Sequence, residues 1–168
     1  KNITMMLRAP GNIVGTTGIK GTANKIRNWR DKLGPRKAGL YLGQVVRMQE
    51  EIGTGGGGFR FLYAAFLEQA ADYLQEDRLM SISDQFTKAG DLWRSSAVQM
   101  AGIYKGRLTE QKDYDAITDI MTEISDIEKN AFKQNCNYSL GPQLIGGLCS
   151  ECRCQRRNVD KARSLTRL

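Results

Sequence analysis

Residues 53–74 read GTGGGGFRFLYAAFLEQAADYL and hold the pattern that decides the fold. Four glycines follow Thr54, and the apolar residues after them recur at steps of three and four. This spacing is typical of an amphipathic helix, because residues three and four apart lie on one helix face. The apolar residues are Phe59, Leu62, Tyr63, Phe66, Leu67, Ala70, Tyr73 and Leu74. The sequence therefore predicts a helix of about 17 residues that follows a glycine-rich turn.

The same helical spacing continues on both sides of this stretch. Two helices are expected before the glycines, over 22–33 and 36–52, because Gly34 and Pro35 form a stop and a restart between them. Two further helices are expected after it, the first starting at Ser81 or Ser83 and the second at Thr109 or Asp113. Residues 20–132 contain no strand-like alternation of apolar and polar residues. We therefore expect an all-α fold, a bundle of about five amphipathic helices with a glycine-rich helix–helix corner.

The apolar positions of these helices predict the core. In residues 36–52 the buried stripe is expected to hold Leu42, Val45, Met48 or Gln49, and Ile52. Most aromatic side chains fall on the apolar stripes and are expected in the core rather than on a ligand-binding surface. These are Trp29, Tyr63, Phe66, Tyr73, Phe86, Trp93 and Tyr104.

The two ends of the chain lack helical periodicity. Residues 1–21 are rich in Gly, Thr and Asn around Pro10-Gly11, which favours a loop, either a linker or the end of a preceding domain. Residues 133–168 form an irregular basic tail that contains all four cysteines. The expected organisation is a helical domain over 22–132 between these two segments.

Length and composition bound the function. The chain has 168 residues, 40% of them hydrophobic and 26% charged, which are ordinary proportions for one globular domain. It has no run of about 18 apolar residues and no secretion signal, so we expect a cytoplasmic protein without a membrane span. It contains no histidine, which excludes a complete Ser-His-Asp or Cys-His mechanism within this chain. Because it opens at Lys1, we expect a processed product or a piece of a longer protein.

The charge is uneven along the sequence. The net charge is +7, with a basic excess at both ends and an acidic excess over residues 61–132. A basic surplus attracts anionic partners such as nucleic acid, acidic proteins or phosphate. The Lys and Arg residues are scattered and no nucleic-acid-binding motif accompanies them, which favours solvated helix faces and argues against nucleic acid.

The glycine run itself has two interpretations, because ordering four consecutive glycines is entropically costly and requires a reason. The first is a tight corner in which backbone packs on backbone. The second is an anion site, since backbone N–H groups at a helix N-terminus bind phosphate or carboxylate and Arg60 would add a charged donor. Neither a P-loop nor a dinucleotide motif is complete here. The candidate residues for substrate or anion binding are Gly55, Gly56, Gly57, Gly58, Arg60 and Tyr63.

The tail holds the only candidate metal ligands. Cys136, Cys149, Cys152 and Cys154 have the spacing C-x12-C-x2-C-x-C. The C-x2-C element is a common half-site for zinc or an iron–sulfur cluster, but the last gap is shorter than in a usual second pair. Disulfides and reduced thiols are the alternatives, and reduced thiols are the default without a secretion signal.

The stretch Ile52–Ala70, IGTGGGGFRFLYAAFLEQA, resembles part of a known family. It is similar to the C-terminal helical domain of acyltransferases of the butirosin biosynthesis protein H type. In that family a glycine run, Phe-Arg, Tyr-Ala and Phe-Leu-Glu-x-Ala recur in this order. Helices with Trp29 and Tyr41 upstream, and Trp93 downstream, fit the same layout, so the similarity extends over residues 15–132. The cysteine-containing tail is not part of it.

The resemblance implies a function for the whole parent protein. Members carry an N-terminal half similar to papain-like cysteine peptidases, in which a Cys nucleophile has a His partner. They move an acyl group from a carrier-protein phosphopantetheine thioester to an amine in natural-product biosynthesis. That half is not present in this chain, so the resemblance implies an accessory domain that contacts an acyl carrier protein or an N-terminal catalytic domain. The alternative is a non-enzymatic helical binding or regulatory module for an acidic protein or nucleic acid.

Overall fold

The fold was analysed in a computed structural model, which describes residues 2–8, 14–52 and 56–138. These residues form α-helices and one short 3₁₀ helix, and none of them lies in a strand, which confirms the all-α prediction. The elements are α1 (Asn2–Arg8), α2 (Gly15–Arg27), α3 (Trp29–Leu33), α4 (Pro35–Glu50), η1 (Gly57–Phe59), α5 (Arg60–Leu74), α6 (Arg78–Tyr104) and α7 (Gln111–Tyr138).

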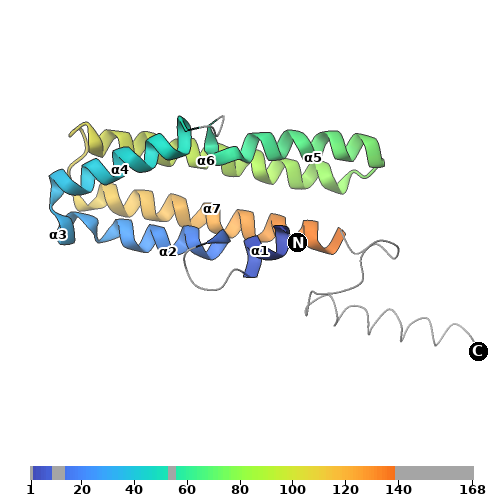
Figure 1. The fold of residues 1–168 in the computed structure, drawn as a ribbon, viewed down its shortest axis with the longest axis horizontal. Helices are drawn as coiled ribbons and strands as arrows, with labels where there is room; N and C mark the ends of the chain where they lie inside the picture. The colour runs from blue at the N-terminus through green and yellow to red at the C-terminus, as the bar shows by residue number, and fades with distance from the viewer. Residues whose placement is uncertain (1, 9–13, 53–55, 139–168) are drawn as a thin grey trace, which may run out of the picture.

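Two long helices, α6 and α7, run along the length of the molecule and pack on each other (Figure 1). Helices α4 and α5 follow one another along α6, and η1 joins them. Helices α2 and α1 lie along α7 in the same way. The fold is therefore a bundle of four helical segments. Two of them are the single helices α6 and α7, and the other two are the pair α4 and α5 and the pair α1 and α2.

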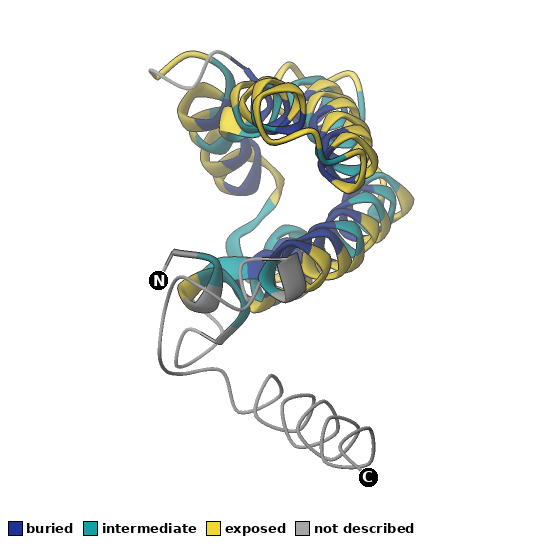
Figure 2. Cartoon of the chain, turned by 90° about the vertical axis from the view of Figure 1, so that its right-hand side faces the viewer, coloured by how far each residue is buried: buried dark blue, intermediate teal, exposed yellow. Residues whose placement is uncertain are grey.

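The core consists of two apolar clusters, one in each half of the bundle. Buried residues lie along the faces where the helices meet (Figure 2). The first cluster includes Ile19, Ala23, Ile26, Ala38, Leu42, Met100, Ile103, Tyr114, Ile117, Met121 and Ile124. The second includes Ala64, Leu67, Ala71, Leu79, Ile82, Phe86, Ala131 and Phe132. Helices α6 and α7 contribute to both clusters and so connect the two halves.

The expectation of a loop over residues 1–21 was wrong for residues 2–8 and 15–21, because α1 and the first half of α2 lie there. Thr16 and Gly18 are buried in α2, which packs on α7. Three side chains of α7, seven residues apart, donate hydrogen bonds to carbonyl oxygens of α2. They are Ser125 to Thr16 (2.8 Å), Thr118 to Ala23 (3.2 Å) and Gln111 to Arg27 (2.9 Å). These tertiary contacts outweigh the low intrinsic helix propensity of Gly and Thr.

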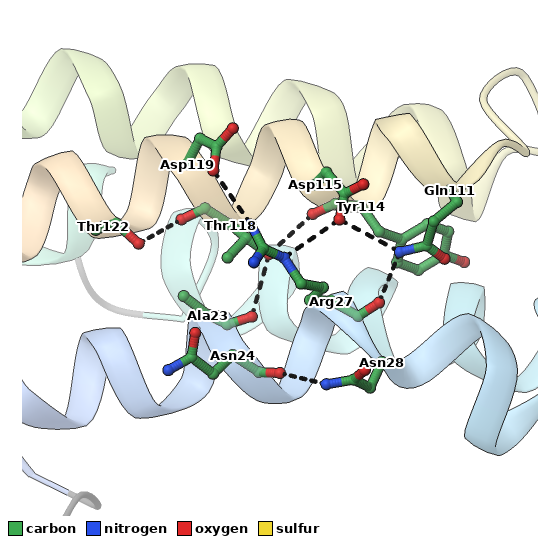
Figure 3. A network of polar contacts seen from close by, with 10 residues as sticks. All are labelled: Ala23, Asn24, Arg27, Asn28, Gln111, Tyr114, Asp115, Thr118, Asp119 and Thr122. Carbon is green, nitrogen blue, oxygen red and sulfur yellow. Dashed lines mark hydrogen bonds and ion pairs between the residues drawn. The ribbon is translucent and has the colours of Figure 1, made fainter.

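Ion pairs connect the C-terminal end of α2 to α7 (Figure 3). The Arg27 guanidinium lies 3.2 Å from an Asp115 oxygen and 3.3 Å from an Asp119 oxygen. All three side chains are substantially exposed, so this cluster adds modest stability. Directly afterwards, Asn28 breaks the helix expected over 22–33 into α2 and α3, and its side chain donates to the carbonyl of Asn24 (3.0 Å).

The start of the tail also needs correction. Helix α7 continues to Tyr138, past the boundary expected at residue 133. Phe132 and Asn135 are buried against α5 and α6, which explains why the helix continues. Helix α6 begins at Arg78, before the expected cap at Ser81 or Ser83, and Ser83 instead donates a buried hydrogen bond to the carbonyl of Ala64 (2.9 Å).

Several side chains expected in the core are exposed. Phe66, Tyr73 and Tyr104 have more than half of their surface exposed, in contrast to buried Phe86. On α4, Gln49 takes the buried position of the predicted stripe, whereas Met48 is exposed, as is Ile52 beyond the helix end. Residues 1–21 were not counted as core, yet Ile19 is part of it.

Candidate functional site

The glycine corner between α4 and α5 is a left-handed turn. Gly57, Gly58 and Phe59 have φ values of 58°, 55° and 70°, a region that favours glycine. A Cβ atom on Gly57 would lie 2.9 Å from the Phe61 ring and 3.4 Å from the backbone of Gly90. The corner is therefore a close helix–helix contact, as the first interpretation predicted.

Arg60, the first residue of α5, points into the bundle rather than to solvent. Its Nε donates to Oε1 of Glu128 (2.7 Å) and its Nη2 to Oε2 (3.0 Å), while Nη1 donates to the carbonyl of Gly58 (2.6 Å). The Glu128 side chain is 0% exposed and that of Arg60 is 21% exposed. The Trp93 indole N–H donates to the same Oε1 (2.9 Å), and its ring centroid lies 5.1 Å from the guanidinium carbon. The Arg60 charge thus has an internal counter-ion.

The backbone of the corner also has an internal anion. The N–H of Gly57 faces both carboxylate oxygens of Glu50, at 3.2 and 3.3 Å. The Gln49 amide nitrogen donates to Glu50 (2.9 Å) and to the carbonyl of Trp93 (2.7 Å). The corner therefore uses the chemistry of the anion hypothesis, but here the carboxylates belong to the chain itself.

The structure brings only some of the remaining candidate residues of the predicted anion site together. Gly55 lies outside the described residues. Gly56 is buried beside Arg94 and Glu50. Tyr63 packs edge-on against Phe86, with ring centroids 4.7 Å apart, and its hydroxyl accepts a hydrogen bond from Asn135 (2.9 Å). The structure thus brings Gly56, Gly57, Gly58 and Arg60 together, whereas Tyr63 belongs to the second apolar cluster.

The predicted metal ligands are mostly outside the described residues. Cys136 lies half-buried on α7, and Cys149, Cys152 and Cys154 are not described. Within residues 2–8, 14–52 and 56–138, no three Cys, Asp or Glu side chains are grouped so as to hold a metal ion. The zinc or iron–sulfur hypothesis therefore stays a prediction.

A pocket of about 370 Å³ lies at the other end of α4, between this helix and the connection from α6 to α7. Its volume is within the range of small-molecule sites. An adjoining hollow of about 320 Å³ shares Pro35, Arg36 and Leu40 with it. The pocket is lined by Pro35, Arg36, Gly39, Leu40, Ile103, Tyr104, Gly106, Leu108, Thr109 and Tyr114.

The rim of this pocket is basic. Arg36 and Lys37 are exposed in the first turn of α4, and Lys105 and Arg107 are exposed on either side of the lining residue Gly106. Tyr114 closes the inner side and is 1% exposed. Burial raises the pKa of the Tyr114 hydroxyl above 10.0, and Asp113 adds to this, while nearby Arg30 acts in the opposite direction. An apolar pocket with a cationic rim suits a ligand that combines an anionic group with an apolar arm.

Sequence reasoning missed Glu128 and the pocket. Glu128 does carry a signal, because it falls between Ile124 and Ala131 on the apolar face of α7, where a carboxylate requires a buried partner. The pocket residues carry none, since they come from three segments that only the tertiary fold brings together.

The described residues form a helical domain. Carboxylates at its centre accept hydrogen bonds from groups of the chain itself, and one end carries a pocket with a basic rim. The chain belongs to the family of the domain of unknown function DUF4872, whose model matches residues 1–134. Comparison with curated proteins gave no match. Comparison with solved structures gave none either.

Among the helices of the described segments, none is both long and apolar enough to cross a membrane.

Proposed function

We propose that this chain is an accessory helical domain of a cysteine-dependent acyltransferase-like protein that acts in the cytoplasm on a carrier-protein thioester. In this proposal the domain holds the phosphopantetheine arm or its carrier protein, and the catalytic Cys and His lie in another part of the parent protein. The resemblance of residues 52–70 to the butirosin biosynthesis protein H type supports the reaction class. The absence of histidine in this chain agrees with an accessory role.

The observation that carries the binding role is the pocket beside Arg36. Phosphopantetheine has a phosphate at one end and a long flexible arm, so it needs a cation next to an elongated hollow. Arg36 lines both the pocket and the adjoining hollow, and Lys37 lines the latter. A charge-assisted hydrogen bond from Arg36 to the phosphate would contribute about 1.5–3 kcal/mol. The same rim would attract an acidic carrier protein.

Binding of a carrier protein in its apo and holo forms tests this proposal. We expect the holo form, which carries phosphopantetheine, to bind the chain at least tenfold more tightly than the apo form in calorimetry. Arg36→Ala should remove most of this difference, whereas Lys20→Ala, an exposed change on α2, should not. Equal binding of the two forms, or no binding, would contradict the proposal.

The second candidate is a non-enzymatic module that binds an acidic protein or nucleic acid. The exposed cations Lys32, Arg36 and Lys37 at one end of the bundle favour it. Nucleic-acid binding would depend steeply on salt and would not require a pantetheine arm. A duplex oligonucleotide that binds more tightly than the holo carrier protein at physiological salt would support this candidate instead.

A further inference from the structure

A long apolar face remains uncovered on the outside of α4 and α5. Leu62, Phe66 and Tyr73 are 60%, 59% and 88% exposed and follow one another at helical spacing on α5. Leu40 and Met48 on α4, and Ile52 just after it, are also more than half exposed. We call these six residues the α4–α5 face. The largest exposed apolar patch of a protein is often an interaction surface.

The face points away from the rest of the described fold. The buried side chains of both helices, such as Leu42 on α4 and Leu67 on α5, turn toward α6 and the core clusters. The two helices have 16 and 15 residues and lie end to end, a length of about 45 Å at 1.5 Å per residue. A strip of that length and about 11 Å wide covers about 500 Å². Two such strips meet the area of about 1,000 Å² that a specific interface requires.

The charges on this face have opposite signs at its two ends. Helix α4 exposes Arg36 and Lys37 in its first turn, whereas Arg47 near the middle of the face lies 3.9 Å from Glu51. Helix α5 exposes Asp72 near its C-terminal end, whereas Glu68 accepts a hydrogen bond from Ser83 of α6 (3.1 Å) and the only cation, Arg60, is paired with Glu128. A second copy of this chain in the antiparallel orientation would place the basic α4 end of each copy against the acidic α5 end of the other. It would also cover Arg36 and Leu40, which line the pocket, so dimerisation would compete with ligand binding there.

We propose that the α4–α5 face is the interface of a symmetric antiparallel homodimer. A two-fold axis makes such an interface self-complementary, because each apolar half and each charged end occurs twice. Apolar burial supplies the affinity, and the charged ends fix the antiparallel direction. A parallel pairing would bring like charges together at both ends.

Sedimentation velocity of the full chain tests the proposal. We expect twice the monomer mass at about 100 µM, a concentration at which even a weak specific dimer is populated. Leu62→Ser with Phe66→Ser should weaken the dimer at least tenfold without lowering the thermal midpoint of the dissociated chain, measured at high dilution, because both side chains are exposed. Val98→Ser, a change of a 70% exposed residue on α6, is the matched control and should leave the dimer intact.

A charge-reversal pair tests the direction. Arg36→Glu with Lys37→Glu makes both ends of the face acidic, and Gln69→Lys with Asp72→Lys makes both ends basic. Each variant alone should dimerise at least tenfold more weakly than the wild type, and an equimolar mixture should form the heterodimer. A wild-type monomer at about 100 µM would overturn the proposal and leave the face to a different partner. A dimer unaffected by Leu62→Ser with Phe66→Ser, or a mixture that fails to associate, would overturn it as well.

Discussion

The Arg60 guanidinium and the Glu128 carboxylate form a two-point ion pair, with N–O distances of 2.7 and 3.0 Å, between the two apolar clusters. This pair links the first residue of α5 to the middle of α7 and lies beside the glycine corner. It divides the bundle into two cores, since Ile124 belongs to one cluster and Ala131 to the other. The positive charge of Arg60, which the anion hypothesis needed at the corner, is already neutralised.

Glu128→Ala should lower the free energy of unfolding by about 3–5 kcal/mol, because it leaves the Arg60 charge and the Trp93 N–H in the interior without their acceptor. Glu123→Ala is the control, since Glu123 is 50% exposed and pairs with Lys88 at the surface (3.2 Å). The control should change stability by at most about 1 kcal/mol. Urea denaturation measures both values, and equal effects would show that the buried pair is not important for the fold.

Replacing the whole pair should be less harmful than removing one partner. In Arg60→Met with Glu128→Leu, apolar side chains of similar size fill the space and no charge remains in the interior. We expect the double variant to be more stable than Glu128→Leu alone, with a coupling energy of about 1–3 kcal/mol between the two positions. A double-mutant cycle by denaturant unfolding measures this coupling. Strict additivity would indicate that the two groups do not interact.

Gly57→Ala should destabilise the fold more than Gly106→Ala. Both glycines have positive φ, 58° and 69°, so both changes carry the conformational cost of about 1–2 kcal/mol for a side chain in this region. Only at Gly57 would the new Cβ also approach the Phe61 ring, at 2.9 Å, whereas nothing lies within 4 Å at Gly106. Thermal denaturation compares the two variants. Equal losses would mean that the corner is not a close contact.

Stability should fall as the pH rises above 10. Burial raises the pKa of the Tyr63 hydroxyl above 10.0, partly offset by the hydrogen bond from Asn135, and burial raises that of Tyr114 in the same direction. Above pH 10 the unfolded chain loses these protons before the folded chain does, which favours unfolding. The contribution is fully present below pH 10. Tyr114→Phe should therefore reduce the loss of stability between about pH 10 and 11, measured by urea denaturation, and an unchanged slope would contradict this.

The sequence contained enough information to predict the all-α class and the glycine-rich helix–helix corner, because helical spacing and a glycine run are local signals. It did not predict α2 over residues 15–21, where Thr16 is buried and its carbonyl accepts a hydrogen bond from Ser125 of α7. Local patterns also cannot pair Arg60 with Glu128, which lies 68 residues further along the chain.

The buried side of helix α5 is a second feature that the sequence could not predict. Apolar residues occupy almost its whole circumference, so periodicity alone could not tell which side is buried. Packing on α6 buries Ala64 and Leu67 and leaves Leu62 and Phe66 exposed. The placement of Phe66 and Tyr73 in the core was wrong for this reason.

The most direct test of the proposed function is a calorimetric titration of 4′-phosphopantetheine into three forms of the full chain. They are the wild type, Arg36→Ala, and the charge-free pair Arg60→Met with Glu128→Leu. Our account predicts that Arg36→Ala weakens binding at least tenfold and that the charge-free pair binds within about twofold of the wild type, since a lost charged hydrogen bond is worth about 1.5–3 kcal/mol. Binding that is lost in the folded charge-free pair but unchanged in Arg36→Ala would locate the anion at the glycine corner and contradict the account.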